Sequence, residues 1–287
     1  MFFQQLINGL AAGSIYAMVA LGYTMIYGVL GIINLAQGEL YMAGAFFAVI
    51  LISDLHFGFL PAFISSLILV ALLGVIIERL VFRPLRNTNP LVPLIAAIGL
   101  SFLLQSLARV LFGTNDRPFP IHFDSKNIDL FSIATVTPID IYIFVFATIL
   151  MATLTLFINK TRYGKAIVAS ATDRDTAKLM GINVDFMIMI TFIIGSILSG
   201  AAGIMMAIAY NSTYPTMGVL PGLKAFSAAI LGGVGSIPGA ILGGLILGVA
   251  ENLGSAYIAS SLKDAIPFTI MIIVLIFRPT GLLGKRE

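Results

Sequence analysis

The sequence contains no cysteine and no tryptophan, and charged residues make up only 10% of its 287 positions. Without cysteine, disulfide bonds, thiol catalysis and cysteine-ligated metal sites are excluded. Soluble globular domains carry about 25% charged residues, so this chain has too few charges to cover a solvated surface. Hydrophobic residues account for 59% of the chain, and its mean hydropathy is +1.04. We therefore predict a polytopic protein whose surface is covered mostly by the lipid bilayer.

The chain also lacks the common catalytic motifs. It has no G-x-x-x-x-G-K-[ST] phosphate loop, so it does not hydrolyse ATP by that route. It has no H-E-x-x-H or G-x-S-x-G sequence, and its two histidines, His56 and His122, fall in expected loops. We therefore expect no enzyme activity, no metal site and no cofactor. The net charge of +3 comes from basic residues near the ends of apolar segments, which favours control of membrane topology over nucleic-acid binding.

Most of the chain is divided into apolar segments long enough to cross a bilayer, which takes about 20 residues. These segments are continuously apolar and do not alternate, so they indicate helices and not barrel strands. We predict an all-α fold of about 7–8 transmembrane helices in one domain, 1–287. The expected spans are 5–30, 36–53, 59–81, 91–112, 138–158, 187–209 and 262–277, with a further apolar region at 222–253.

Lysine and arginine gather in three connections, 79–86, 159–185 and 278–286. Because cytoplasmic loops are enriched in these residues, we expect all three connections in the cytoplasm. The connections 54–60 and 113–137 are poorer in basic residues and are expected outside. This pattern places the N-terminus outside the cell and the C-terminus in the cytoplasm.

Two apolar regions are interrupted, near 28–45 and within 222–253. The second has the sequence GGVGSIPG at 232–239, which should break a helix. Each arm beside this break has about 12–15 residues, or ~20 Å, which is shorter than the ~30 Å hydrocarbon core. We therefore predict a re-entrant pair of half-helices at 222–253. Two broken regions near opposite ends of a chain are typical of pseudo-repeats around a central pathway, although no residue-by-residue repeat is visible.

Polar residues in these breaks are candidates for lining a translocation pathway. In the first break they are Asn34, Gln37 and Glu39, which one helical turn would bring together. Glu39 is the only ionisable side chain before Asp54, and carboxylates inside membranes are costly and often functional. A hydrated position at the cytoplasmic mouth is the alternative. In the second break the candidates are Gly235, Ser236 and Pro238.

Two charged residues flank the second break, Lys224 and Glu251. They either reach separately to water near the outer face or form an ion pair between the two arms. A run of small residues in 187–209, from Gly195 to Gly203, should allow close helix packing.

The connection 159–185 is a mixed-charge island that is too short to form a domain. Residues 165–179 are compatible with a short helix, and Gly181 supplies a stop signal. A helix that only lies on lipid would carry a basic face opposite large apolar residues. Acidic and small residues intrude here instead, so we expect this loop to dock a soluble protein.

Several long blocks resemble the permease subunits of bacterial branched-chain amino acid ABC transporters. They occur in order from Asn8 to Gly284: NGLAAGSIYAMVALGYTMIYGVLGIINLAQGELYMAG, ERLVFRPLR, RYGKAIVASATDRDTAKLMGINVD, LKAFSAAILGGVGSIPGAILGGLILGVAENLGSAY and RPTGLLG. The resemblance implies a multi-pass permease in the bacterial inner membrane that imports branched-chain or other amino acids. An ion-coupled secondary amino-acid transporter, dependent on Glu39, is the alternative.

The resemblance also implies partners and a coupling site. The partners are a second homologous permease, expected as a heterodimer, two ATP-binding subunits and an extracytoplasmic substrate-binding protein. The implied ATPase-coupling residues are Gly164, Lys165, Ala166, Ala171, Asp173, Ala177 and Gly181. Thr172 stands where similar proteins often carry an acidic residue, which removes one charge from the loop.

Overall fold

A computed structural model describes residues 2–121, 128–130 and 134–284, so His122 and the basic tail residues Lys285 and Arg286 lie outside the described residues. Among the described residues, six helices are long and apolar enough to cross a membrane. They are α1 Phe2–Leu30, α3 Phe59–Ile77, α5 Leu91–Phe112, α6 Pro138–Lys160, α9 Val184–Tyr210 and α11 Ile237–Tyr257. The all-α polytopic fold predicted from the sequence is confirmed.

Shorter elements complete the fold. Three shorter helices are apolar: α2 Gln37–Ser53, α10 Val219–Gly232 and α12 Ala265–Phe277. The π-helical turn η1 Glu78–Phe82 and α4 Arg83–Leu85 continue α3. The remaining elements are α7 Arg162–Thr172, α8 Arg174–Leu179, the 3₁₀ turn η2 Ser260–Leu262, and an antiparallel pair of strands, β1 Ile128–Leu130 and β2 Ala134–Val136.

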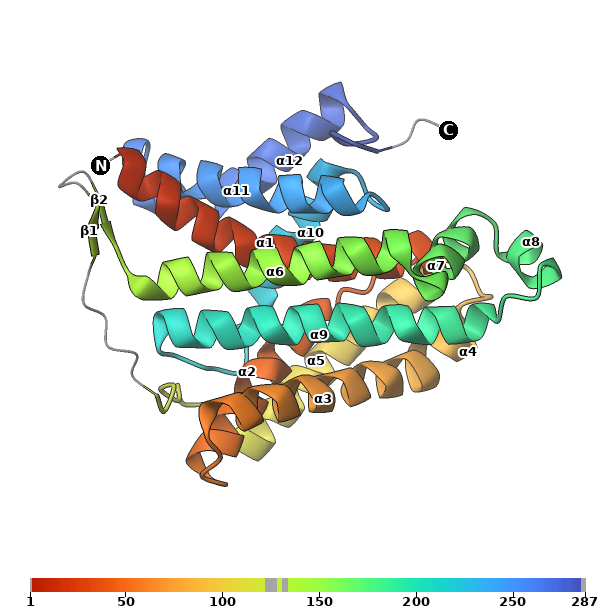
Figure 1. Ribbon diagram of the computed structural model, residues 1–287, viewed down its shortest axis with the longest axis horizontal. Coiled ribbons are helices and arrows are strands. Elements are labelled where there is room, and N and C mark those ends of the chain that lie inside the picture. The colour runs from red at the N-terminus through yellow and green to blue at the C-terminus, as the bar shows by residue number, and fades with distance from the viewer. Residues whose placement is uncertain (1, 122–127, 131–133, 285–287) are drawn as a thin grey trace.

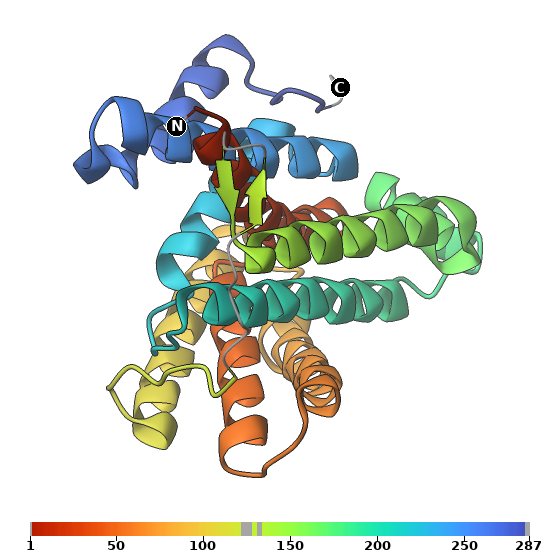
Figure 2. The same ribbon diagram turned by 60° about the vertical axis from the view of Figure 1, so that its left-hand side comes forward.

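The long helices run between two ends of the molecule (Figure 1). The N-terminus and the two strands lie at one end, and α7 and α8 lie at the other, which we call the coupling end. Figure 2 shows α11 and α12, in blue, on one flank and α2, α3 and α5, in orange and yellow, on the other. Helices α1, α6 and α9 lie between these flanks.

The central helices are α1 and α9, which are mostly buried, whereas most residues of α3, α5 and α6 are partly or fully exposed. Small residues explain how neighbours approach α1 and α9 so closely. A Cβ atom at Gly248 of α11 would lie 2.2 Å from the Cα of Gly13 in α1. At Gly203 of α9 it would lie 1.9 Å from the Tyr41 carbonyl oxygen. The close packing expected of the small residues in 187–209 is thus confirmed, and it lies inside this chain.

The second break differs from the expected pair of half-helices. Helix α10 is short, with 14 residues, but α11 has 21 and is long enough to cross. The bend between them lies at the coupling end, because a Cβ atom at Gly28, near the end of α1, would lie 3.7 Å from Gly235. The apolar region was expected to end at 253, whereas α11 continues to Tyr257 and contains several glycines, among them Gly244. Here they remain helical and make room for the backbone of α1.

The described C-terminal residues fold back onto this bend. The Leu282 and Leu283 amides donate to the carbonyls of Leu231 and Gly232 over 2.8 and 2.9 Å. These bonds satisfy two of the last carbonyls of α10, which have no partner within their own helix. The C-terminal segment therefore also lies at the coupling end, opposite the N-terminus.

Candidate functional site

The coupling loop consists of two short helices with side-chain caps. Thr161 caps α7 by accepting a hydrogen bond from the Gly164 amide at 3.0 Å. Asp173 caps α8 by accepting from the amides of Asp175 and Thr176. Hydrogen bonds from the side chain and backbone of Thr176 hold the pKa of the exposed Asp173 carboxyl below its usual value. Gly181 follows α8 with φ +80°, the left-handed conformation of a helix stop.

The predicted coupling residues divide into an exposed and a buried set. Lys165, Ala171, Asp173 and Gly181 are exposed, Ala166 is half-buried, and Gly164 and Ala177 are buried. A Cβ atom at Gly164 would lie 2.4 Å from the backbone of Ile158, so this glycine permits the tight turn from α6 into α7. Gly164 is therefore needed for the shape of the loop and is not accessible to a partner.

Large apolar side chains on the loop are exposed, which the sequence analysis did not single out. Leu179 is 88% exposed and Met180 75% exposed, and Tyr163 and Val168 are also exposed. We call these four residues the apolar coupling surface. Tyr163 and Val168 lie on α7, Leu179 is the last residue of α8, and Met180 follows it directly.

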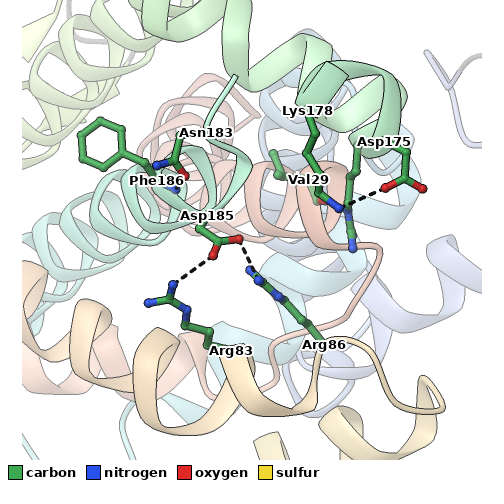
Figure 3. A network of polar contacts seen from close by, with 9 residues as sticks. Val29, Arg83, Arg86, Asp175, Lys178, Asn183, Asp185 and Phe186 are labelled. Carbon is green, nitrogen blue, oxygen red and sulfur yellow. Dashed lines mark hydrogen bonds and ion pairs between the residues drawn. The ribbon is translucent and has the colours of Figure 1, made fainter. Parts of the chain in front are cut away.

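Two sets of polar contacts tie the loop to the membrane helices. The Nε atom of Arg174 in α8 donates to the Val29 carbonyl at the end of α1 over 2.8 Å. Asp185, at the start of α9, forms ion pairs with Arg83 at 2.9 Å and Arg86 at 2.7 Å (Figure 3). Movement of the loop would therefore act directly on α1 and on α9, into which the loop leads, and through the Asp185 ion pairs α9 is joined in turn to the segment that follows α3.

The first break, residues 31–36, lies between α1 and α2 and is held by amides. The Asn34 side chain accepts from the Ala36 amide and donates to Gln37. The Gln37 side chain donates to the Gly195 carbonyl at 2.8 Å and to the Ser199 hydroxyl at 2.7 Å. Both side chains are fully buried and attach the break to α9. Their polar atoms are engaged within the protein, so their assignment to the pathway stays a prediction.

Glu39 lies two residues beyond Gln37 and has a different environment. Its carboxylate is 1% exposed, and its Oε1 atom accepts from the Ser101 hydroxyl at 2.8 Å and the Gln105 amide at 2.9 Å. Its Oε2 atom has no hydrogen-bond partner in the part of the chain that the structure describes. The sequence could not pair Glu39 with α5, because the contact joins residues more than 60 positions apart.

Glu39 lines a cavity of about 330 Å³, which we call the Glu39 cavity. The other lining residues are Tyr23, Leu35, Ile98, Ser101, Phe102, Gln105, Gly218, Val219, Gly222 and Leu223. Helices α2 and α10 both begin here, and their backbones nearly touch, since a Cβ atom at Gly218 would lie 1.9 Å from the Gly38 carbonyl oxygen. The cavity thus combines one carboxylate, a few hydroxyl and amide groups, and apolar walls.

The candidates of the second break lie elsewhere, in the bend at the coupling end. Ser236 caps α11 by accepting from the Gly239 amide, Pro238 occupies the first turn, and Gly235 has φ +92°. Each residue therefore has a local structural role in turning the chain, and none lines the Glu39 cavity. Their place in a pathway stays a prediction.

The two charges that flank the second break form an ion pair. Lys224 Nζ lies 2.9 Å from Glu251 Oε1 and 2.6 Å from Asp264 Oδ1, and both Lys224 and Glu251 are buried. These contacts join α10, α11 and the start of α12. The ion pair between arms, one of the two readings of the sequence, is the arrangement present.

Comparison with known proteins shows which family this chain belongs to. Residues 5–275 match the family model described as the permease component of branched-chain amino acid transport systems. The chain belongs to this family. The permease is 42% identical to the high-affinity branched-chain amino acid transport system permease BraD of Pseudomonas aeruginosa, covering 100% of this chain and 97% of that relative. It is 41% identical to LivH of Escherichia coli K12, covering 100% and 96%.

The fold of the permease is also found in a solved structure. The complex PsaBC from Streptococcus pneumoniae with a Fab contains a chain that matches with a TM-score of 0.53 and 14% identity, covering 95% of the permease and 91% of that chain. This likeness concerns the fold alone. The named relatives are transport permeases, so this chain is a transport subunit and not an enzyme.

Proposed function

We propose that this permease is one of two membrane subunits of an ABC importer for branched-chain amino acids. It pairs with a second, homologous permease, binds two ATP-hydrolysing subunits at its coupling end, and receives substrate from an extracytoplasmic binding protein. The absence of a phosphate loop is consistent with a separate motor. The substrate assignment draws on the relatives BraD and LivH, whose names specify branched-chain amino acids.

The strongest support for a separate ATPase motor comes from the coupling end. Leu179 and Met180 extend from a loop that is rich in charge, at an end of the molecule beyond the long apolar helices. Exposed apolar residues of this kind mark protein interaction sites. The loop is also tied to α1 through Arg174, and it leads directly into α9, whose Asp185 is paired with the segment after α3, so a docked motor would have mechanical access to the membrane helices.

Charge supports a cytoplasmic coupling end. The basic residues of α4, α7 and α8 belong to this end. Arg278 precedes the segment that folds back onto the bend at the same end. An excess of basic residues is typical of a cytoplasmic face. The N-terminus then lies outside and the C-terminus inside.

The Glu39 cavity is the proposed portion of the substrate pathway. Its wall includes Phe102 and Leu223, whose side chains are 66% and 39% exposed in this subunit. A second permease packed against α5 and α10 would cover these residues and complete the cavity. The pathway would then run between the two membrane subunits.

The assignment is tested by replacing Leu179 with glutamate in the assembled transporter. Because Leu179 is almost fully exposed, the variant should fold normally yet lose contact with the ATPase. We expect transport and binding-protein-stimulated ATP hydrolysis to fall together. Leu55→Glu, an exposed site after α2, is the control and should leave both unchanged. Normal coupling in Leu179→Glu would refute the docking role.

An ion-coupled secondary transporter remains the second candidate, because Glu39 is a buried carboxylate without an ion-pair partner among the described residues. It predicts uptake in proteoliposomes that is driven by a proton or sodium gradient without ATP. The ABC assignment predicts no uptake until ATP and the binding protein are supplied. The two conditions separate the candidates in one experiment.

A further inference from the structure

The carboxylate of Glu39 is only half satisfied. Ser101 and Gln105 both donate to Oε1, and the described part of the chain offers no donor to Oε2. A buried carboxylate oxygen without a donor carries a desolvation penalty. A buried group of this kind needs a structural or functional explanation, and a bound partner from outside the protein is one of them.

Glu39 also forms no ion pair in the described part of the chain; Arg109 attracts it electrostatically, but from beyond ion-pair distance. Every ion pair in the described residues uses another carboxylate, namely Asp175, Asp185, Glu251 or Asp264. The first turn of α2 does favour an anion at this position, because the positive end of the helix dipole lies there. The anionic form is thus supported by the backbone, and it keeps one unused acceptor, Oε2, which is buried beside the cavity and which a cationic ligand would reach through a small movement of the wall.

The shape and chemistry of the cavity restrict which cation fits. Its volume of about 330 Å³ lies within the usual range of small-molecule sites. Metal ions such as Ca²⁺ need six or more oxygen ligands, and no cluster of three or more acidic or histidine side chains occurs among the described residues. An ammonium group needs fewer acceptors and donates three hydrogen bonds.

The remaining walls suit an aliphatic amino acid. Phe102 and Leu223 supply apolar surface beside Glu39, and the Tyr23 hydroxyl lies near Gly222, where a Cβ atom would be 3.6 Å from it. The N-terminus of α10, at Gly218, opens on the same cavity and favours a negative group. A carboxylate acceptor, a helix N-terminus and an apolar wall together match the ammonium, carboxylate and side chain of one zwitterion.

We infer that the Glu39 cavity binds the amino acid in transit, with its ammonium group on Oε2 of Glu39 and its side chain against Phe102 and Leu223. The inference rests on the proposed importer function and adds a substrate site within the membrane subunit. Selection of an α-amino acid then occurs twice, once on the binding protein and once in the permease.

The first test measures uptake by the complete transporter in proteoliposomes, with ATP inside and leucine-loaded binding protein outside. Glu39→Gln keeps the size of the side chain and an oxygen for Ser101 and Gln105, but removes the charge. We expect its uptake rate to fall by roughly 10- to 100-fold, the factor that corresponds to one hydrogen bond to a charged group. Thr24→Val is the matched control, because Thr24 is equally buried, also lacks a hydrogen-bond partner for its hydroxyl, and does not line the cavity.

The second test separates binding from a structural role by thermal unfolding of the purified complex without binding protein. Empty Glu39→Gln should unfold at the wild-type temperature or above it, because a buried charge that forms no ion pair has been removed. L-leucine and leucine methyl ester, which both carry the ammonium group, should raise the unfolding temperature of the wild type and leave Glu39→Gln unchanged. 4-Methylpentanoate, which lacks that group, should shift neither protein.

Four outcomes would overturn the inference: wild-type uptake by Glu39→Gln, a wild type that leucine does not stabilise, equal stabilisation by 4-methylpentanoate, or equal stabilisation by sodium or potassium chloride. Failure of the proposed function looks different, because the wild-type transporter would then accumulate no branched-chain amino acid with ATP and binding protein present.

Discussion

The contact between Arg174 and Val29 leads to a prediction about energy coupling. Arg174 Nε donates to the last turn of α1 at 2.8 Å, where helix carbonyls have no partner of their own and a cation is favoured by the helix dipole. Immediately after this turn comes the break at 31–36, which leads to Gln37 and Glu39. Arg174 therefore connects the coupling loop to the helix that precedes the cavity.

The energy of this contact follows from its geometry. A hydrogen bond to a charged donor contributes about 1.5–3 kcal/mol, and the half-buried position of Arg174 favours the lower part of that range. Arg174→Met keeps the length of the stem and its helix propensity but removes the donor and the charge. A loss of about 1.5 kcal/mol corresponds to a roughly tenfold change in an equilibrium. We expect the number of leucine molecules imported per ATP hydrolysed to fall by about that factor.

The assay measures uptake and ATP hydrolysis in the same proteoliposomes. Lys178→Met is the control on the same helix, because its ion pair with Asp175 is solvent-exposed on both sides and worth at most ~1 kcal/mol. Arg174→Lys, which keeps the charge, should recover part of the coupling. If Arg174→Met imports as many molecules per ATP as the wild type, the contact does not transmit the motion of the motor.

Three further predictions concern stability. Lys224→Met should lower the free energy of unfolding by about 3–5 kcal/mol because it leaves the buried Glu251 with only the more distant Lys263, 4.0 Å away. Adding Glu251→Gln should recover most of that loss in thermal unfolding. Gly248→Val should lower the free energy of unfolding by about 1–3 kcal/mol or more, because it forces α11 away from α1. Gly99→Val is the control and should be tolerated in the same assay, because nothing lies within 4 Å of its Cβ position. Hydrogen bonding from a threonine side chain of α8 lowers the pKa of Asp173. The Asp173 cap therefore stabilises α8 fully above the ordinary aspartate pKa, and this stabilisation is lost as the pH falls through the lowered pKa of the folded protein. Asp173→Asn, which keeps a capping oxygen, should remove this acid dependence of amide exchange in α8, and equal acid dependence in both proteins would contradict the assignment.

The membrane helices were the most predictable part of the fold. The span expected at 91–112 coincides with α5, because a continuous apolar run has a single low-energy state in lipid, in which every backbone group is paired within the helix. The break at 31–36 was also visible, since glycine and amide residues interrupt the apolar pattern there. Long-range polar contacts were not predictable. Glu39 is joined to Ser101 and Gln105 by tertiary packing, which local patterning does not encode.

The roles of individual polar residues were less predictable than their positions. Asn34 and Gln37 have the composition of a pathway lining, yet their hydrogen bonds fasten the break, and Gln37 reaches partners about 160 positions away. Gly164 was expected among the ATPase-coupling residues, which stays a prediction, and its position is buried under the end of α6. In both cases the residue type was informative, but which of its neighbours it meets is decided by the packing of the helices.

The hydrogen bonds from Leu282 and Leu283 to the end of α10 restrict where the chain can be truncated or fused to a tag. A Cβ atom at Gly281 would lie 2.5 Å from the Gly233 nitrogen, so even small changes in this segment meet the backbone of the bend. Truncation before Gly281 would expose two helix carbonyls and free the bend that joins α10 to α11. A reporter or affinity tag fused directly after Gly284 would disturb the same bend. The N-terminus, at the opposite end of the molecule from this joint, is the safer place for such a fusion.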